Sequence, residues 1–222
     1  VASPSFFQVN LQQLDCLLGL VKQRLKLSGK EVVVDAYSGV GTFALLLAPY
    51  SRKIIAIEES PAAVEDAKAN TENIAGVEFL TGRTEDVLGQ LREIPHGVIL
   101  DPPRKGCHPS VLAALNLLNP QRVVYVSCDP ETLARDLKIL CQGSFHLEEV
   151  QPIDMFPQTY HIESLATLRQ RNTIPGLILA SSSPRRQELL TSLGISAKVV
   201  PPSVLEDFIG EEPEDFVVRL AL

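Results

Sequence analysis

The sequence lacks any apolar run long enough to cross a membrane and any recognisable leader at its start. No uninterrupted apolar stretch approaches the ~20 residues that a membrane-spanning helix needs. The opening residues, VASPSFFQVN, have neither the charged region nor the apolar core of a signal peptide. They also lack an initiator methionine, which indicates a piece of a longer chain. We therefore expect a cytoplasmic protein with no membrane association.

Cysteine is scarce, and positive charge is in deficit. The four cysteines show no C-x-x-C spacing and no clustering with histidine, so we expect no metal site and reduced thiols. The chain has 20 Lys and Arg against 27 Asp and Glu, giving a formal net charge of −7. This is the wrong sign for a free-standing nucleic-acid binder, whose affinity comes largely from Lys and Arg on phosphates.

What is present is a regular alternation of apolar patterns. Short apolar runs with β-branched residues indicate buried strands, and helix-like patterns lie between them. Such alternation predicts an α/β fold with a parallel, Rossmann-like sheet. Two further strand candidates with no helix between them predict a C-terminal antiparallel hairpin. The expected strands are residues 31–37, 53–58, 77–82, 97–103, 122–128, 145–154 and 161–170. The expected helices are 11–26, 42–50, 61–70, 85–93, 110–118 and 130–140.

A second segment begins near residue 173. The turn-rich stretch RQRNTIPG (169–176) interrupts the alternation, and a new strand-to-helix pattern follows it. We assign residues 1–172 to one domain and residues 173–222 to a truncated α/β segment. That segment is too short for an independent core.

A glycine-rich loop, VDAYSGVGTF (34–43), follows the first expected strand. Gly39 and Gly41 allow backbone to pass close to a ligand. The loop lacks the third glycine of the dinucleotide fingerprint and fits the D-x-x-x-G-x-G pattern of methyltransferases that bind S-adenosylmethionine. Glu58, at the end of the next strand, can accept both ribose hydroxyls of an adenosine. In the alternative interpretation the glycines only turn the chain and Glu58 is a solvated strand end.

Two more strand ends carry reactive or polar side chains. In LDPPRKG (100–106), Asp101 and Arg104 can orient a polar heterocycle, or pair with each other. Cys128 follows the fifth strand, directly before the helix start at Asp129–Pro130. The positive end of that helix favours a thiolate, although cysteine is also a common buried residue. Both interpretations of Cys128 remain open on this pattern alone.

Glu163 lies between Ile162 and Ser164 in an otherwise apolar strand. Burial of a carboxylate raises its pKa toward the range of a general base. His161 is close in sequence and can also act as a base, but we expect it in a turn.

These residues stand in motifs that resemble a known family. The motifs SFFQVN, DAYSGVGTF, AIEES, DPPRKG, VSCDPETLARDL and DMFPQTYHIES occur in the order found in bacterial RNA uracil-C5 methyltransferases. The resemblance covers residues 4 to about 170 and is greatest to the branch acting on 23S ribosomal RNA, with transfer RNA enzymes as the alternative. It implies a class I S-adenosylmethionine-dependent methyltransferase fold and methylation of uridine C5 through a covalent cysteine–C6 adduct.

The resemblance also implies a role for each matching residue. Cys128 corresponds to the nucleophile and Glu163 to the base. Arg104 and Phe6 correspond to the substrate side, with Phe6 beside the flipped base. Thr42 departs from the Asn of some members. The cofactor site would comprise Gln8, Tyr37, Gly39, Gly41, Thr42, Glu58, Asp101 and, as a weaker candidate near the adenine, Asp86.

Members of this family carry an RNA-binding β-barrel and a central domain ahead of the catalytic domain, with an iron–sulfur cluster in some. None of this is in the present segment, which accounts for its acidic charge. We expect a monomer whose RNA partner is bound through the missing N-terminal region. The chain as given should bind cofactor but methylate RNA poorly.

The tail resembles a different family. LILASSSPRRQELLTSLGI (177–195) is similar to the opening of the Maf nucleotide pyrophosphatases. Arg185 and Arg186 follow a helix start at Ser183–Pro184, where they could meet phosphate oxygens or remain solvated. The later catalytic residues of that family would lie beyond residue 222, so we assign the tail no activity. Three alternatives stay open. The first is a Maf-like pyrophosphatase fused to a degenerate methyltransferase, and the second is a methyltransferase of small molecules or proteins that does not need Cys128. The third is a non-catalytic fragment that serves only as a binding module.

Overall fold

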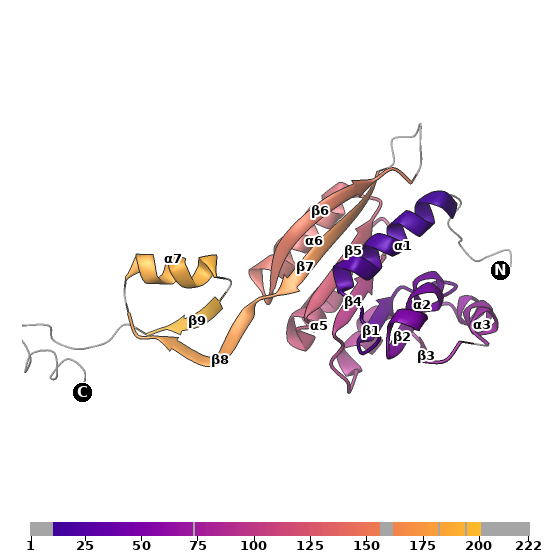
Figure 1. Ribbon diagram of the computed structural model, residues 1–222, viewed down its shortest axis with the longest axis horizontal. Coiled ribbons are helices and arrows are strands. Elements are labelled where there is room, and N and C mark those ends of the chain that lie inside the picture. The colour runs from indigo at the N-terminus through magenta and orange to yellow at the C-terminus, as the bar shows by residue number, and fades with distance from the viewer. Residues whose placement is uncertain (1–10, 73, 156–161, 182, 194, 201–222) are drawn as a thin grey trace, which may run out of the picture. The chain divides into compact units, whose positions relative to one another are not determined.

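The computed structural model describes residues 11–72, 74–155, 162–181, 183–193 and 195–200. The chain divides into two compact units, Val1–Gln170 and Arg171–Leu222. In the described residues, the first unit holds a seven-stranded sheet covered by helices, and the second holds a two-stranded sheet with one helix (Figure 1).

The strands of the first unit have the spatial order β3-β2-β1-β4-β5-β7-β6. Strands β1 to β5 pair in parallel, whereas β7 pairs antiparallel with both β5 and β6. The predicted α/β class, parallel sheet and terminal hairpin are thereby confirmed. The strands are β1 Val32–Ala36, β2 Lys53–Glu58, β3 Val77–Thr81, β4 Gly97–Leu100, β5 Arg122–Ser127, β6 Phe145–Ile153 and β7 Glu163–Gln170.

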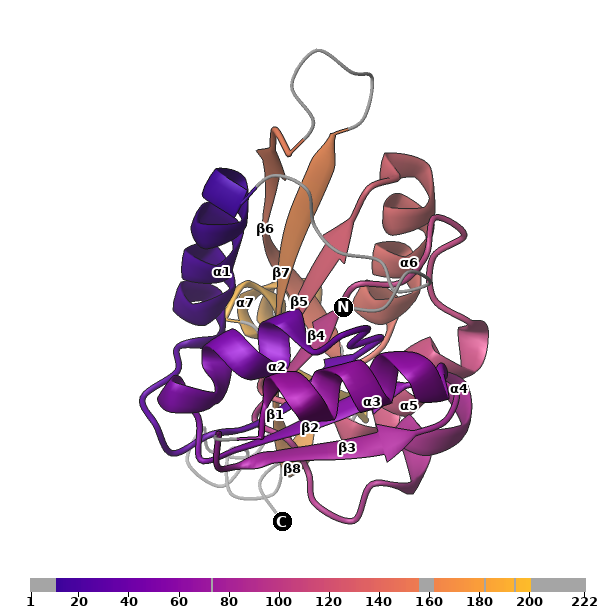
Figure 2. The ribbon, with the colours of Figure 1, turned by 90° about the vertical axis from the view of Figure 1, so that its right-hand side faces the viewer.

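Helices pack on both faces of this sheet (Figure 2). On one face, α1 and α2 cover an apolar cluster that includes Val33 and Ile99. On the other, α5 and α6 cover a cluster that includes Val34 and Tyr125. Because neighbouring residues of a strand point to opposite faces, strands covered on both sides read as continuous apolar runs. The helices are α1 Leu11–Leu25, α2 Thr42–Leu47, α3 Pro61–Asn70, α4 Thr84–Val87, α5 Pro109–Leu118 and α6 Pro130–Gln142, with 3₁₀ turns at Ala48–Tyr50 and Leu88–Gln90.

The starts of α3 and α6 follow from a capping side chain and the proline after it. Asp129 accepts hydrogen bonds from the backbone N–H of Glu131 at 3.1 Å and of Thr132 at 2.9 Å. Ser60 caps α3 in the same way. Such acceptors satisfy donors that the first helical turn leaves unpaired, and the fixed φ of proline suits this turn. Both helix starts predicted from the sequence are confirmed.

One predicted helix is much shorter than expected. Residues 85–93 read as a single helical segment, but the structure forms only the one-turn helix α4 and the 3₁₀ turn Leu88–Gln90. Gly89 stands in the middle of this segment and disfavours a regular helix. So short a stretch also gains few hydrogen bonds to offset the cost of starting a helix.

Strand β1 lies at the centre of the sheet and buries a carboxylate. All five of its residues are buried, and Asp35 is 0% exposed. Asp35 Oδ2 accepts a hydrogen bond of 3.1 Å from the backbone N–H of Ala44, which ties β1 to the first turn of α2. Burial, followed by repulsion from Asp101, raises the pKa of Asp35 from 3.8 to about 8.

The second unit is a small α/β arrangement. Strand β8 (Asn172–Leu179) pairs in parallel with β9 (Ile195–Val199), and helix α7 (Pro184–Ser192) connects them. This confirms the predicted strand-to-helix pattern after residue 173. Among the helices that the structure describes, none is long and apolar enough to cross a membrane.

Replacing Asp35 by asparagine should reduce the pH dependence of the free energy of unfolding. Between pH values of about 4 and about 8, the unfolded chain has released a proton that folded Asp35 retains. The wild-type free energy of unfolding therefore falls as pH rises through this range, by at most about 1.4 kcal/mol per pH unit from this group. Asp35→Asn lacks that contribution.

Urea unfolding of both proteins across this pH range measures the difference. Asp15→Asn, at an exposed position of α1, is the matched control and should follow the wild-type curve. Parallel curves for Asp35→Asn and the wild type would contradict the raised pKa.

Candidate active site

The topology brings the predicted reactive residues to one edge of the sheet. Tyr37, Asp101 and Cys128 directly follow the parallel strands β1, β4 and β5, and Glu58 is the last residue of β2. The ends of parallel strands meet at the same edge. Strand β7 runs the opposite way, so its first residue, Glu163, lies at this edge too, next to the end of β5, where Ser127 pairs with Ser164.

Asp101 and Glu163 also share a face of the sheet. Ile99 and Leu165, two residues from each along their strands, both belong to the apolar cluster under α1 and α2. Because side chains alternate between the two faces along a strand, Asp101 and Glu163 lie on the face covered by α1 and α2. Burial and repulsion from Glu163 raise the pKa of Asp101 to about 7. Glu163 is only 4% exposed, and burial raises its pKa as well.

Cys128 stands in a tight turn between β5 and α6. The Ser127 hydroxyl donates to the backbone oxygen of Asp129 at 3.0 Å, and the Asp129 N–H donates back to Ser127 Oγ at 3.1 Å. These bonds close the turn around Cys128, which is partly exposed at the start of α6. The partial positive charge of a helix N-terminus favours an anion at that place.

Arg104 lies near the same turn. Hydrogen bonds from Thr132 and Glu131, with a smaller contribution from the positive charge of Arg104, hold the pKa of Asp129 below its usual range. Arg104 is exposed on the loop between β4 and α5. The arrangement places a cation beside the turn that contains Cys128.

The glycine-rich loop is fastened to the end of β2 by Glu58. Its Oε2 accepts from the backbone N–H of Gly39 at 2.9 Å, and its Oε1 from the N–H of Ser60 at 2.8 Å. Tyr37 adopts a left-handed φ of 69°, a conformation that costs a non-glycine residue roughly 1–3 kcal/mol and is common at ligand sites. The buried hydroxyl of Ser38 has no hydrogen-bond partner in the part of the chain that the structure describes.

The two glycines of this loop have different surroundings. Both have a left-handed φ, 54° at Gly39 and 81° at Gly41. A Cβ on Gly39 would meet no atom within 4 Å, so the space beside it is open to a ligand. A Cβ on Gly41 would lie 3.3 Å from that of Ala67 and close to the ring of Phe79. Gly41 therefore lets the loop pack against α3 and β3.

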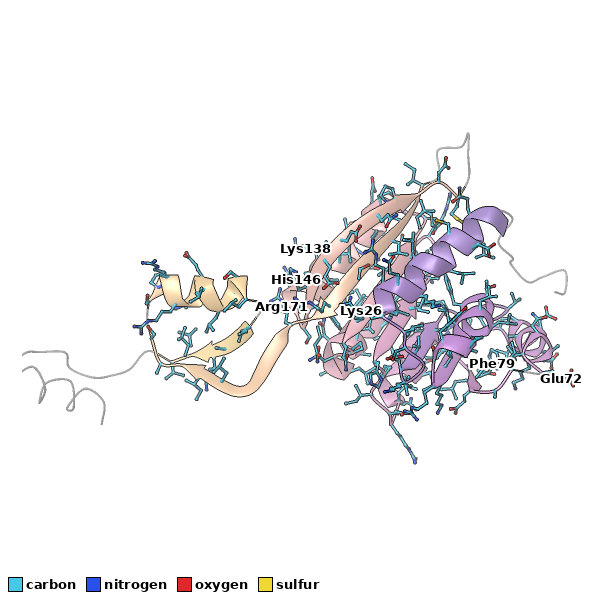
Figure 3. The ribbon with its side chains drawn as sticks, viewed as in Figure 1. Lys26, Glu72, Phe79, Lys138, His146 and Arg171 are labelled. Carbon is cyan, nitrogen blue, oxygen red and sulfur yellow. The ribbon has the colours of Figure 1, made fainter. Side chains whose placement is uncertain are left out.

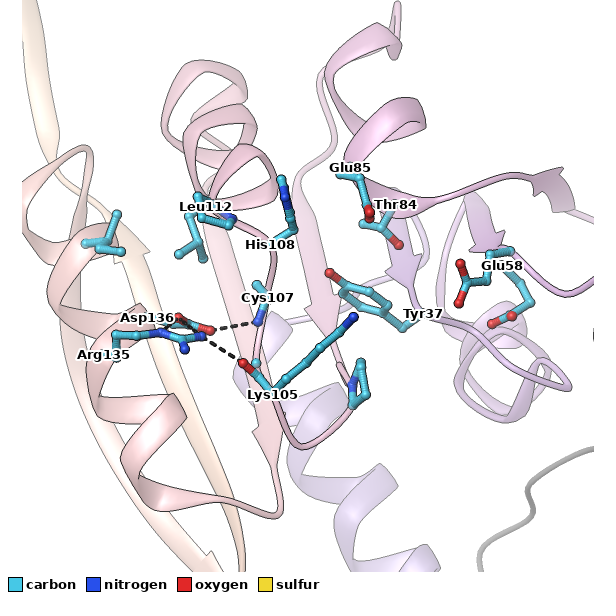
Figure 4. A pocket seen from close by; sticks show the side chains of 15 residues that line it. Tyr37, Glu58, Thr84, Glu85, Lys105, Cys107, His108, Leu112, Arg135 and Asp136 are labelled. Carbon is cyan, nitrogen blue, oxygen red and sulfur yellow. Dashed lines mark hydrogen bonds and ion pairs between the residues drawn. The ribbon is translucent and has the colours of Figure 1, made fainter.

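A pocket of about 580 Å³ opens beside this loop (Figure 4). Its volume is in the range of small-molecule sites. Tyr37 and Glu58 form one part of its wall, and the loop after β4 and the helix α6 form another. The remaining side chains labelled in Figure 4 are Thr84, Glu85, Lys105, Cys107, His108, Leu112, Arg135 and Asp136.

Of the predicted site residues that the structure describes, only Tyr37 and Glu58 line this pocket. Its wall does not include the other main candidates, Gly39, Gly41, Asp101, Arg104, Cys128 and Glu163. Thr84 and Glu85 line it, whereas their neighbour Asp86 is exposed and is not part of its wall. Thr42 begins α2, next to the glycine loop. Gln8 and Phe6 lie outside the described residues.

The sequence interpretation missed the side of the pocket formed by Lys105, His108 and Arg135. Lys105 is within the DPPRKG motif, His108 follows that motif by two residues, and Arg135 is within VSCDPETLARDL. The motifs mark these positions but do not show that the three side chains form one wall. Cys107 also lines the pocket, and it is only 4% exposed. Burial raises the pKa of Cys107 to about 12, so this thiol keeps its proton at neutral pH.

Family models match both parts of the chain. The model described as tRNA (Uracil-5-)-methyltransferase matches residues 2–171. The model described as Maf-like protein matches residues 176–222.

Curated relatives are similar to the first part. An uncharacterized RNA methyltransferase of Synechocystis is 48% identical over 171 residues, covering 76% of this chain and 37% of the relative. One of Clostridium acetobutylicum is 43% identical over 175 residues, covering 77% of this chain and 38% of the relative. The chain thus spans less than two fifths of the length of these relatives.

Solved structures agree with the fold. The tRNA (uracil-54, C5)-methyltransferase of Pyrococcus abyssi, in complex with S-adenosyl-L-homocysteine, has a TM-score of 0.64 and 39% identity, covering 74% of this chain and 40% of that one. TrmN from Thermus thermophilus has a TM-score of 0.57 at 18% identity, covering 69% and 48%, and shows similarity of fold alone. The predicted class I methyltransferase fold is confirmed. With its family model matching residues 2–171, the chain belongs to the tRNA (Uracil-5-)-methyltransferase family.

Proposed function

We propose that this chain is the catalytic domain of an enzyme that transfers a methyl group from S-adenosylmethionine to C5 of a uridine in RNA. The observation that carries the proposal is the meeting of Cys128, Glu163 and Asp101 at one edge of the sheet, beside a glycine loop and a pocket. Family membership supports the same activity.

The glycine loop and the strand ends beside it fit this cofactor. The open space beside Gly39 leaves room for a ligand against the loop, and the Ser38 hydroxyl is a buried polar group without a partner in the described residues. Glu58, at the end of β2, would hold the ribose hydroxyls, with Tyr37 beside it in the pocket wall, and Asp101, directly after β4, would complete the cofactor site. When bound, S-adenosylmethionine supplies an electrophilic methyl group on a sulfonium.

Cys128 would activate the uracil ring for methylation at C5. Uracil C5 is too weak a nucleophile to take a methyl group unaided. Attack of the Cys128 thiolate on C6 forms an S–C6 bond, and the electron pair of the C5=C6 double bond moves into an enolate with carbanion character at C5. C5 can then accept the methyl group. The uridine must leave its stack to reach Cys128, as in other enzymes that modify bases.

Glu163 completes the reaction as general base. It accepts the proton from C5, the electron pair of the C5–H bond restores the C5=C6 double bond, and the S–C6 bond breaks to release Cys128. Glu163 is 4% exposed, and its burial raises its pKa, which makes a carboxylate a better proton acceptor. Its position at the first residue of β7, next to the end of β5, supports this role.

The class of RNA is a separate proposal. The sequence motifs favour a uridine of 23S ribosomal RNA, whereas the Pyrococcus abyssi structure belongs to an enzyme named for tRNA. Because the chain carries a net charge of −7 and spans less than two fifths of its relatives, we propose that much of the RNA-binding surface lies outside these residues. Nucleoside mass spectrometry of both RNAs from cells lacking the complete gene would identify the target.

For residues 173–222 we propose part of a Maf-like unit, on the strength of the family-model match to residues 176–222. Arg185 and Arg186 are exposed at the start of α7, and Arg186 Nη1 donates to Ser181 Oγ at 3.3 Å. These arginines are the candidate phosphate ligands. Release of pyrophosphate from nucleoside triphosphates by the complete protein, lost in Arg185→Ala, would favour the pyrophosphatase alternative.

Cys128→Ala should abolish covalent capture of RNA that contains 5-fluorouridine. After methyl transfer, fluorine at C5 cannot leave as a proton does, so the wild-type complete protein should accumulate a protein–RNA complex that survives denaturing gels. Loss of the nucleophile should reduce complex formation by about 10³-fold or more. Cys16→Ala, exposed on α1, is the matched control and should trap RNA normally. Undiminished trapping by Cys128→Ala would show that the nucleophile is another group.

Glu163→Gln should stop the reaction after methyl transfer. The glutamine cannot accept the C5 proton, so a covalent complex should accumulate even on ordinary uridine, with turnover reduced about 10²- to 10⁴-fold. Wild-type turnover should rise with pH as Glu163 ionises, and its raised pKa places that rise above the usual range of a glutamate. Gel analysis and steady-state methylation measure both. Glu131→Gln, exposed on α6, should behave as wild type. Full turnover by Glu163→Gln would assign the base elsewhere.

Glu58→Gln should weaken cofactor binding. The change removes a charged acceptor from the loop and from the ribose, so the Kd for S-adenosylhomocysteine should rise about 10- to 100-fold, the range for hydrogen bonds to a charged group. Isothermal titration calorimetry measures this Kd. Glu65→Gln, exposed on α3, is the control. An unchanged Kd in Glu58→Gln would remove Glu58 from the cofactor site.

A further inference from the structure

The loop between β4 and α5 is fastened to helix α6 through its own backbone. Thr132 Oγ1 donates to the carbonyl oxygen of Arg104 at 3.1 Å, and Arg135 Nη2 donates to that of Lys105 at 2.9 Å. Two residues further along the loop and one residue further along the helix, the N–H of Cys107 donates to Asp136 Oδ2 at 2.8 Å. Figure 4 shows the last two of these bonds. We call Thr132, Arg135 and Asp136 the loop clamp.

Asp136 joins three elements at one buried point. It is 0% exposed and accepts a second hydrogen bond from the Tyr125 hydroxyl at 2.7 Å, so it links β5, α6 and the loop. Arg135 pairs with its other oxygen through Nε at 2.9 Å and Nη2 at 2.8 Å. A buried carboxylate is stable only when its oxygens have such partners. With all of these partners in place, the loop and helix α6 have one preferred relative geometry.

The loop approaches the helix more closely than any side chain would allow. Gly106 has a left-handed φ of 76°, and a Cβ there would lie 2.6 Å from both Arg135 Nη2 and Asp136 Oδ2. The same Cβ would be 3.2 Å from that of Thr132. The contact is therefore a close fit of loop backbone against all three clamp residues.

The clamp lies between two parts of the candidate active site. Its residues are at positions i, i+3 and i+4 of the first two turns of α6, and so share one face of the helix that begins directly after Cys128. The loop that they hold begins with Asp101 and carries Arg104. Fixing the loop to α6 thus fixes these two residues relative to the nucleophile.

We propose that Thr132, Arg135 and Asp136 are positioning residues that set the placement of Cys128 against the Asp101–Arg104 segment. The proposal rests on the proposed function. Attack on C6 needs the sulfur and the bound pyrimidine in one geometry, and a displacement of about 1 Å can cost 10²-fold in rate. The clamp residues act through the loop and the helix and need not touch the substrate.

Two near-isosteric variants test this. Thr132→Val removes the hydroxyl that holds Arg104, and Tyr125→Phe removes one donor to Asp136; neither residue lines the pocket. The single-turnover rate of covalent complex formation on 5-fluorouridine RNA, at saturating S-adenosylmethionine, should fall about 10- to 100-fold in the complete protein. The Kd for S-adenosylhomocysteine and the urea midpoint should change little, and Thr132→Ser should restore the rate. Lys138→Ala, exposed on the same helix, is the matched control (Figure 3).

The outcomes separate the two proposals. If the wild type forms no complex through Cys128, the proposed function fails. If it does, and both variants form the complex at the wild-type rate, the clamp proposal is overturned while the function stands. A rate that falls only together with cofactor affinity and the urea midpoint, and that serine does not restore, would show a purely structural role and would also overturn it. If Tyr125→Phe does not fold, the rates of Thr132→Val and Thr132→Ser, at a position that is only partly buried, test the proposal on their own.

Discussion

The candidate active site depends on the reversal of one strand. Strands β1 to β5 run in parallel, so their ends present Tyr37, Glu58 and Cys128 at a common edge. A further parallel strand at the place of β7 would put its first residue at the opposite edge, more than ten ångströms away at about 3.3 Å per residue. Because β7 instead pairs antiparallel with β5, its first residue, Glu163, comes beside the end of the strand that precedes Cys128. The terminal hairpin is therefore the element that brings the proposed base to the proposed nucleophile.

That arrangement gathers carboxylates in a buried place. Asp35, Asp101 and Glu163 lie on the same face of the sheet as the apolar residues under α1 and α2. The pKa of each of the three is raised. Burial is the main cause, and repulsion between Asp35 and Asp101 and between Asp101 and Glu163 adds to it. A site of this kind is unfavourable when all three are ionised and becomes more favourable when a cation is present. The sulfonium of the proposed cofactor carries that sign of charge, so the same feature that strains the free protein supports cofactor binding.

The succession of strands and helices along the chain and the starts of α3 and α6 could be predicted because they follow from local patterns: apolar runs of strand length, and a capping residue before proline. The strand ends then followed from topology. The pocket wall made by Lys105, His108 and Arg135 could not be predicted, since it depends on a loop packed onto α6 through backbone atoms that no side-chain pattern reveals. Gly41 shows the same limit. In sequence it matches a glycine that makes room for a ligand, but its neighbours are Ala67 and Phe79, and only Gly39 faces open space.

Two cysteines near this edge differ in their surroundings, and these surroundings favour Cys128 over Cys107 as the proposed nucleophile. Cys107 is 4% exposed, and burial raises its pKa to about 12, so it remains a thiol and cannot attack a pyrimidine at neutral pH. Its backbone N–H instead serves the contact with Asp136. Cys128 is partly exposed, at the positive end of α6, and its turn is closed by Ser127 and Asp129. Helix α6 thus has a different relation to each cysteine: it holds the loop of Cys107 through Asp136, and it presents its N-terminus to Cys128. A shift of the helix would disturb both, which is why the contacts along its first two turns matter to the chemistry at its start.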